Sequence, residues 1–412
     1  MEQQELIPHL FRTEYRKITA VLCKLFGIAH IEVAEDIAGE TFLSALETWP
    51  YRGIPENPTA WLYSVAKNKA KNHINRSHIF AEKIVKEVQS ATPLSEEIVI
   101  DLSEKNITDS QLQMLFAICH PAISAEAQIG LALRILCGFG IDEIANALLT
   151  NKETISKRLL RAKEKLRQEK VKIEYPGPAE INDRIEPVLT TLYLLFNEGY
   201  YSESNDTVLR EDLCLEAMRL THLLIENELT NQPKVNALLS LMCFQSSRFA
   251  ARKNENGDII LYEDQNESLW NRDLIDRGVY FLNLSAKGTE ISKYHLEASI
   301  AWWHTIKEDT NEKWESILQL FNHLLQIEYS PVAALNRTYA LSKAIGKEAA
   351  IAEAEKLQLE HNHFYFTLLG ELYKDIDNHK AKQYLQKALS MAKTQTDKQI
   401  IKKKIEALIN YH

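Results

Sequence analysis

The stretch at 138–169 constrains the fold of this chain most, because its pattern predicts two short helices joined by a tight turn. The first helix should run from about Ile141 to Leu149, with Gly140 at its start. The second helix follows Asn151, whose side-chain oxygen is a good cap for an unpaired backbone N–H. Its apolar residues recur at the spacing of one helix face: Ile155, Leu159, Ala162 and Leu166.

The second of these helices is also strongly basic. Residues 152–172 hold nine Lys or Arg against three Glu. Arg158, Arg161 and Lys165 share a face of the helix, and Lys157 lies beside them. The pattern favours a helix-turn-helix whose second helix enters the major groove of DNA. On this segment alone, a basic helix with a purely structural role stays open as the alternative.

The composition indicates an all-α protein of two or three domains, since 412 residues exceed one ordinary domain and Ala, Leu, Glu and Lys are plentiful. No apolar run approaches the roughly 18 residues of a membrane helix, so we expect no membrane association. The N-terminal residues lack the apolar centre of a secretory signal. Five dispersed cysteines without a CxxC pair favour buried free thiols in a reducing cytoplasm.

Charge is divided unevenly along the chain. Residues 1–172 contain 22 Lys and Arg and 22 Asp and Glu, so the net charge of −9 lies entirely in residues 173–412. An acidic C-terminal part would repel DNA or could cover a basic surface of the same chain.

Residues 8–78 predict three helices before the helix-turn-helix. Gly27 should end the first, and the second, at 34–49, combines an apolar stripe with an acidic side. The third should begin at Asn57–Pro58, because proline is tolerated in the first turn of a helix. Its Lys and Asn residues could approach phosphates and unstacked bases.

Three segments in this order resemble an extracytoplasmic-function sigma factor of the sigma-70 family: AEDIAGETFLSAL, AWLYSVAKNKA and ETISKRLLRAKEKLR. The resemblance covers about residues 8–170. It implies that the first segment binds core RNA polymerase, that the second reads the −10 promoter element and that the third reads the −35 element. Gly39, Asn72 and Glu153 depart from residues common in the family, which leaves the promoter sequence open.

The resemblance implies three sets of site residues. The polymerase-binding set is Asp36, Glu40, Phe42, Leu43 and Glu47. The −10 set is Asn57, Trp61, Lys67, Asn68, Lys69, Lys71 and Arg76. The −35 set is Asn151, Lys152, Thr154, Ser156, Lys157, Arg158, Arg161 and Lys165.

The domain order follows from the same resemblance and from the position of Pro and Gly. We expect sigma region 2 at 1–78, a linker at 79–108 that contains Pro93, sigma region 4 at 109–170 and a second linker at 171–183. The remaining residues, 184–412, should form a helical domain that modulates activity and could bind a protein partner.

Two segments of the C-terminal part resemble degenerate tetratricopeptide repeats. Leu335-Asn336-x-x-Tyr339 and Leu369-Gly370-x-x-Tyr373 lie 34 residues apart, which is the tetratricopeptide period. Each is followed by a helix of small residues, and this extension resembles the one found in a subgroup of these sigma factors. The repeats predict stacked pairs of helices.

Enzyme activity is not expected, and neither is a metal or cofactor. An acidic cluster at 263–276 lies near His295 and His304, but no catalytic motif accompanies it. Two alternatives to a sigma factor stay open: a different helix-turn-helix regulator with a repeat sensor domain, and a repeat scaffold whose basic helix contacts protein.

Overall fold

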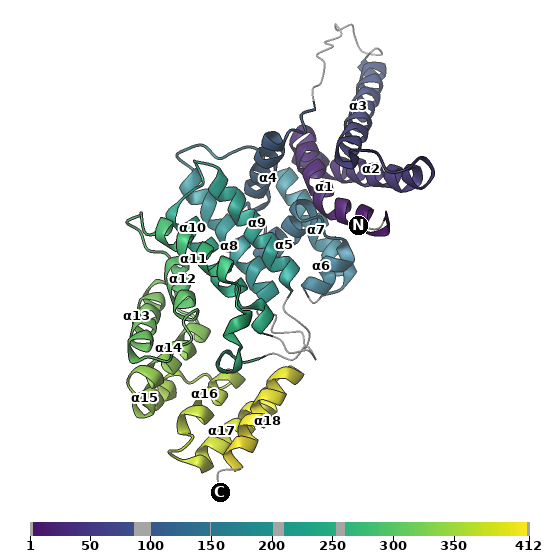
Figure 1. Cartoon of the computed structure of the whole chain (residues 1–412). Helices are drawn as coiled ribbons and strands as arrows, with labels where there is room; N and C mark the ends of the chain where they lie inside the picture. Colours follow the sequence, from purple (N-terminus) through teal and green to yellow (C-terminus); the bar gives the residue numbers. More distant parts are fainter. Residues whose placement is uncertain (1–2, 86–99, 149, 201–209, 253–259, 410–412) are drawn as a thin grey trace. The chain divides into compact units, whose positions relative to one another are not determined.

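The structure is a computed structural model that describes residues 3–85, 100–148, 150–200, 210–252 and 260–409. All regular secondary structure in these ranges is helical, which confirms the predicted all-α fold class (Figure 1). The chain divides into two compact units, Met1–Leu194 and Leu195–His412. None of the helices in the described ranges has both the length and the apolar character required to cross a bilayer.

The first unit begins with three long helices, α1 (Gln3–Phe26), α2 (Ile31–Arg52) and α3 (Pro58–Val85). Gly27 ends α1 as predicted, with a φ of +79° that glycine adopts without steric cost. Helix α2 packs against both α1 and α3. The largest fully buried side chains of these helices include Ile18, Leu22, Trp49 and Leu62.

The helices on either side of the first predicted linker extend into it at both ends. Helix α3 continues to Val85, and α4 (Glu104–Ile118) begins within the range assigned to the linker, 79–108. The Ser103 side chain caps α4 by accepting a hydrogen bond from the Asn106 N–H. Pro93 lies outside the described residues.

The rest of the first unit packs short helices around the basic helix α7. These elements are α5 (Ala125–Leu131), a π-helical turn (Ala132–Leu136), α6 (Ile141–Ala147) and α7 (Lys152–Gln168). Helix α6 starts after Gly140 as predicted, and the Gly140 N–H donates to the Glu143 carboxylate over 2.7 Å. It ends at Ala147, earlier than predicted, and Leu149 lies outside the described residues.

The boundary between the units falls inside α8 (Ile181–Tyr200) and not in the predicted linker 171–183. The first part of α8 packs within the first unit. The Arg184 guanidinium donates to the Phe116 carbonyl over 2.9 Å, and the buried Thr191 hydroxyl donates to Gln128 Oε1 over 2.7 Å. The first turns of α8 therefore complete the core of the first unit.

The second unit begins with a set of packed helices, of which α10 contacts α9, α11 and α12. Its larger elements up to residue 327 are α9 (Glu211–Glu226), α10 (Pro233–Ser246), α11 (Arg272–Ser285), α12 (Lys293–Trp303) and α13 (Asn311–Ile327). Helices α10 and α11 approach closely at Gly278, where a Cβ would lie 2.5 Å from the Phe244 ring. A side chain at this position would force the two helices apart.

A buried lysine organises the polar centre of the second unit. Lys313, which is 1% exposed, donates to the carbonyl of Ile306 over 2.6 Å and to the Tyr262 hydroxyl over 3.1 Å. A longer bond of 3.4 Å reaches the Glu308 carbonyl. Burial lowers the pKa of Lys313, and the nearby Asp309 carboxylate opposes this effect.

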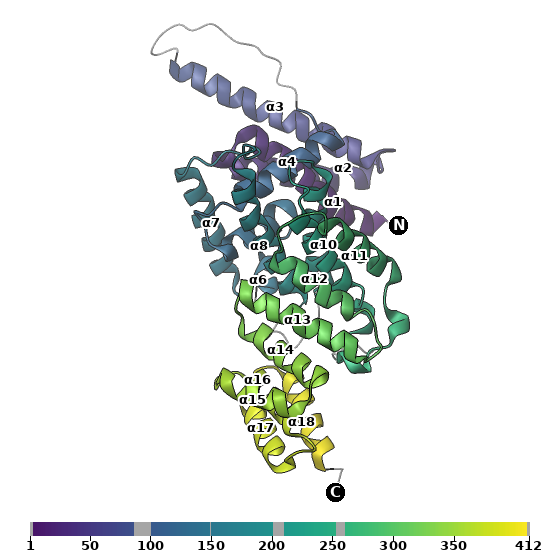
Figure 2. The same cartoon turned by 90° about the vertical axis from the view of Figure 1, so that its left-hand side faces the viewer.

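The predicted repeats form consecutive pairs of helices (Figure 2). The pairs are α14 (Pro331–Ala344) with α15 (Lys347–Leu357), and α16 (His363–Tyr373) with α17 (Asn378–Met391); α18 (Gln395–Ile409) follows. Small residues let the helices approach, since a Cβ on Gly370 would lie 2.6 Å from Leu385. Ala350, Ala354, Ala381 and Ala388 are fully buried.

Candidate nucleic-acid interface

Helix α7 forms as its sequence predicts. The Asn151 side chain caps it by accepting a hydrogen bond from the Thr154 N–H over 2.7 Å. Its apolar stripe packs towards α5 and α6 and is buried along its whole length. The buried positions are Ile155, Leu159, Ala162 and Leu166.

The predicted cationic face of α7 borders a groove. Lys157, Arg161 and Lys165 are exposed and Arg158 is half-buried. Together with Thr154 and the segment 122–127 before and within α5, they line a groove of about 540 Å³. Since the cations lie on one wall, the groove suits an anionic backbone such as that of DNA.

The other predicted −35 residues lie around the start of the helix. Ser156 and Lys152 are exposed, and the Lys152 amine pairs with Asp142 of α6 over 3.0 Å. Because both partners of that pair are largely exposed, it holds Lys152 only weakly and leaves it available to a phosphate. Asn151 serves mainly as the helix cap.

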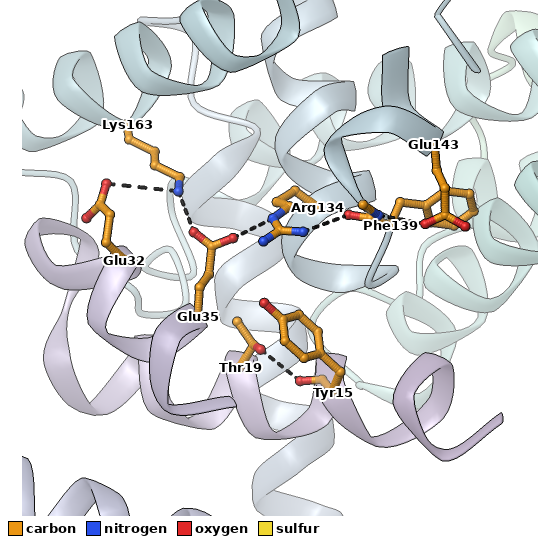
Figure 3. Close-up of polar contacts among 9 residues, drawn as sticks. Tyr15, Thr19, Glu32, Glu35, Arg134, Phe139, Glu143 and Lys163 are labelled. Carbon is orange, nitrogen blue, oxygen red and sulfur yellow. Dashed lines mark hydrogen bonds and ion pairs between the residues drawn. The ribbon is translucent and has the colours of Figure 1, made fainter. Parts of the chain in front are cut away.

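Two cations of α7 face away from the groove. Lys163 is 8% exposed and its amine contacts Glu35 of α2 over 2.5 Å (Figure 3). Arg167 reaches Glu32 of α2 over 3.3 Å. The basic excess of residues 152–172 is therefore divided between two faces. Lys163 contributes to the basic excess of the helix but is not among the predicted −35 residues, and its amine lies in an ion pair inside the first unit.

The predicted −10 residues lie along α3 and at its start. Asn57 caps the helix by accepting the Ala60 N–H over 2.9 Å, and Trp61 packs edge-on against Trp49 with 5.4 Å between ring centroids. Lys67 and Lys69 are half-buried, and Lys69 pairs with Glu40 of α2 over 3.1 Å. The remaining members of the set are exposed: Asn68, Lys71 and Arg76.

The predicted polymerase-binding residues of α2 separate into surface and core. Asp36, Glu40, Leu43 and Glu47 are exposed on one side of the helix. Phe42 is 3% exposed and packs against Phe11 with 5.1 Å between ring centroids, so it supports the helix from within.

Two exposed apolar residues near that side of α2 were not predicted. Leu46 is 53% exposed and Tyr51 is 89% exposed, next to the acidic residues of the same helix. The exposure of Leu46 could have been predicted from the sequence, because this residue falls outside the apolar stripe of Ala34, Ala38, Phe42 and Ala45. Together with Leu43 these side chains give the helix an apolar surface beside its carboxylates.

Sequence reasoning also missed Glu35. It lies between Ala34 and Ile37, on the buried side of α2, where an acidic residue requires a buried partner. Its position on the apolar side of the helix could have indicated from the sequence that Glu35 has a buried cationic partner. The partner on α7, Lys163, gives the same indication, because it follows the buried Ala162.

Two members of the acidic cluster of the second unit, Glu263 and Glu267, have protein partners. Glu263 accepts the Tyr339 hydroxyl over 2.9 Å and Glu267 pairs with Arg272 over 2.7 Å. His295 accepts the Ser292 N–H at the start of α12. In the described residues no group of three His, Cys, Asp or Glu side chains could hold a metal ion.

All five cysteines are buried free thiols, as the sequence predicts. Burial raises the pKa of the Cys119 thiol to about 12, which keeps it protonated. The cysteines therefore belong to the cores of the two units.

Comparison with known proteins places the N-terminal part in a family. Residues 10–78 match sigma-70 region 2, and residues 184–286 match a family of unknown function, DUF6596. An uncharacterized protein of Rhizobium meliloti strain 1021 is 32% identical over 384 residues, which cover 92% of this chain and 90% of the relative. No solved structure matches the chain.

A sigma-70 region 2 indicates a role in promoter recognition and transcription initiation, through core RNA polymerase and promoter DNA. Its match spans the helices that carry the exposed acidic and basic residues described above, α2 and α3. The chain therefore belongs to the same family as the Rhizobium meliloti protein and, with its sigma-70 region 2, is a sigma-70 family factor.

Proposed function

We propose that this protein is an extracytoplasmic-function sigma factor of the cytoplasm whose first unit makes every promoter contact. Helix α2 binds core RNA polymerase, α3 reads the −10 element and α7 reads the −35 element. The C-terminal helices, beginning in α8, modulate this activity and offer a surface to a protein partner.

The observation that carries the proposal is the cationic groove of α7 in a chain that also has a sigma-70 region 2. Four basic side chains, Lys157, Arg158, Arg161 and Lys165, lie on one wall of that groove, while the apolar stripe is buried behind them. Lys165 pairs with Glu169 of the same helix over 2.7 Å at an exposed position. A capped helix with a buried apolar side and a solvent-facing basic side is the geometry with which a recognition helix enters a major groove.

Polymerase docking is tested by reversing the exposed charge of α2. Asp36→Lys combined with Glu40→Lys should abolish co-purification with core RNA polymerase, because both carboxylates are exposed and the ion pair of Glu40 with Lys69 lies at the surface, where a basic partner can replace it. A matched control, Glu180→Lys with Asp183→Lys, reverses two exposed charges at the start of α8 and should bind normally. Normal binding by a folded α2 variant would move the docking surface elsewhere.

Transcription distinguishes this proposal from the alternative regulator. Run-off transcription with core polymerase and genomic DNA fragments should start at defined sites only when the protein is added. A regulator that is not a sigma factor would bind some of these fragments without core polymerase and would not initiate.

The modulating role of the C-terminal helices is tested by truncation. The cut belongs after Tyr200, since α8 contributes Thr191 and Arg184 to the first unit and removing it would damage that unit directly. We expect lower transcription from the shortened chain, because the C-terminal helices are proposed to support initiation. Activity at or above that of the full chain would assign them an inhibitory role.

A further inference from the structure

The charge of the C-terminal part is unevenly distributed between its helices. Helices α17 and α18, at residues 378–409, contain eight lysines and only two acidic residues, Asp397 and Glu406. Residues 173–412 carry a net charge of −9, to which these two helices contribute +6, so the remaining residues of that part carry −15. The acidic C-terminal part therefore contains one strongly basic pair of helices.

Most of these lysines have no acidic partner. Lys404 pairs with Glu371 of α16 over 3.1 Å. Six others are exposed, and no carboxylate of the described residues lies within ion-pair distance of their amines: Lys380, Lys382, Lys387, Lys393, Lys402 and Lys403. Exposed amines without a neighbouring carboxylate create a positive potential that attracts anions.

Two of the exposed lysines lie against α16. The Lys387 amine lies 4.1 Å from the centre of the Phe366 ring, and the Lys380 amine lies 5.0 Å from the centre of the Tyr373 ring. Both rings belong to α16. The attraction between a cation and the face of an aromatic ring holds these two side chains on that side of α17.

The other exposed lysines lie on the side of α17 and α18 that faces away from α16. Lys382 follows Lys380 by two residues and Lys402 precedes Lys404 by two, so each points about 200° around its helix from the lysine that contacts α16. Lys393 lies about three turns beyond Lys382 and shares its side. Helices α17 and α18 pack together and only three residues separate them, so they run antiparallel (Figure 1). The exposed lysines on this side form one surface, the lysine face: Lys382, Lys393, Lys402 and Lys403.

The residue types of the lysine face favour the phosphates of duplex DNA over a protein or a membrane. No large apolar side chain of residues 378–408 is exposed, whereas protein interfaces and membrane-binding helices bury such side chains. Lysine is also depleted at protein interfaces. The last arginine of the sequence is Arg337, so the face has no guanidinium with which to read bases.

We propose that the lysine face binds duplex DNA outside the −10 and −35 elements, through the phosphates and without sequence preference. The inference rests on the proposed sigma function, which brings the second unit to DNA that the first unit reads. Lys382 and Lys393 are about 16 Å apart along α17 at 1.5 Å per residue, which is the length of about five base pairs. Binding releases the cations that surround the phosphates, so it weakens as the salt concentration rises.

Binding of the full-length protein to a labelled duplex that lacks both promoter elements tests the proposal. Fluorescence anisotropy at several salt concentrations gives the affinity and its salt dependence. Lys382→Gln, Lys393→Gln, Lys402→Gln and Lys403→Gln together should lower the affinity at low salt by about tenfold or more. The slope of log K against log salt should become shallower by about 0.9 for each phosphate contact that is lost.

A matched control replaces two exposed lysines of the same unit outside the lysine face, Lys287→Gln with Lys356→Gln. It is compared with Lys402→Gln combined with Lys403→Gln, which removes the same charge. The pair from the lysine face should lose affinity and slope, whereas the control pair should keep the parent's values. Equal losses in both pairs would reflect net charge alone and would overturn the proposal.

Chemical acetylation of the parent protein gives a second measurement that needs no variant. The duplex should protect the four amines of the lysine face from acetylation and leave Lys287 and Lys356 unprotected, as read by mass spectrometry. Circular dichroism and thermal melting establish that each variant is folded. A folded four-lysine variant with the parent's affinity and slope would overturn the proposal, and so would unprotected amines in the parent.

Other outcomes separate this proposal from the alternatives. If the lysine-face variants bind the duplex normally but lose binding to core polymerase, the face contacts protein and the proposal is wrong. If the protein does not start transcription but these variants still lose duplex affinity, the proposed function fails and the lysine face stands. If it starts transcription and the variants bind the duplex as the parent does, only the lysine face fails.

Discussion

Each compact unit buries a lysine, but the two lysines are paired in different ways. Lys163 of the first unit bonds to a carboxylate on a helix that is distant in sequence, Glu35 of α2. Lys313 of the second unit bonds to neutral acceptors, two of which lie within its own neighbourhood at Ile306 and Glu308. Lys163 forms an ion pair between segments that are distant in sequence, whereas Lys313 stabilises a turn close to it in sequence.

This difference decides what each lysine can do. When the helices that carry Lys163 and Glu35 separate, water solvates both charges, so the cost of breaking the pair is partly recovered. The carbonyls around Lys313 cannot leave, because they belong to the turn that precedes its helix. An ion pair between segments suits a reversible contact, whereas local carbonyl bonds suit permanent structure.

The largest expected effect is the loss of Lys313. Lys313→Met should lower the free energy of unfolding of the second unit by about 3 kcal/mol, because three part-buried acceptors lose the same donor. Lys163→Met should leave the free energy of unfolding of the second unit unchanged, because Lys163 belongs to the first unit. Hydrogen exchange resolved by segment measures both. Equal losses in the second unit would remove the distinction between the two lysines.

The second effect separates Lys163 from its neighbours on α7. Arg158→Ala and Arg161→Ala should each weaken binding to −35 duplex DNA by about 1–3 kcal/mol, since both line the groove. Lys163→Met should retain the parent's DNA affinity, because its amine faces α2. Fluorescence anisotropy with labelled duplex gives the affinities. A Lys163 variant that is as weak as Arg161→Ala would place Lys163 on the DNA face.

The third effect concerns the surroundings of Lys313. Burial, aided by Arg248 and Lys313, lowers the pKa of His304 from 6.5 to about 3, so His304 is neutral in the folded unit. Below pH 6.5 His304 binds a proton in the unfolded chain but stays neutral in the folded unit. Stability should therefore fall as the pH is lowered from 6.5 towards 3, by up to about 1.4 kcal/mol per pH unit.

Urea unfolding at several pH values measures this slope, and His304→Gln supplies the reference. The variant should lose that part of the slope while the contributions of other groups remain. If parent and variant show the same pH dependence, His304 is not the group that titrates.

The smallest effect distinguishes folding from binding within the −35 set. Asn151→Ala should lower the free energy of unfolding of the first unit by about 1 kcal/mol, because the Thr154 N–H loses its cap. Asn151→Asp keeps a capping oxygen and should restore stability. Thermal melting monitors both variants. If Asn151→Ala does not change the stability, the cap contributes nothing to folding, and the role of Asn151 is limited to DNA contact.

The sequence by itself determined the local features of this protein. The stops and caps at Gly27, Gly140 and Asn151 act through backbone conformation and nearby hydrogen bonds, which depend on a few neighbouring residues. The helix periods likewise placed the buried stripe of α7 and the small residues of the repeat helices. Order and spacing of three segments were enough to indicate the sigma-70 family.

Only the tertiary structure decided which charges meet. Lys163 and Arg161 belong to one basic helix, but their directions differ, and the partner of Lys163 lies 128 residues away in the chain. The family resemblance assigned Phe42 to the polymerase-binding set, although it lies in the apolar stripe of α2, and the structure packs it against Phe11 of another helix. Pairing between distant segments depends on how helices pack, and local patterns do not encode that packing.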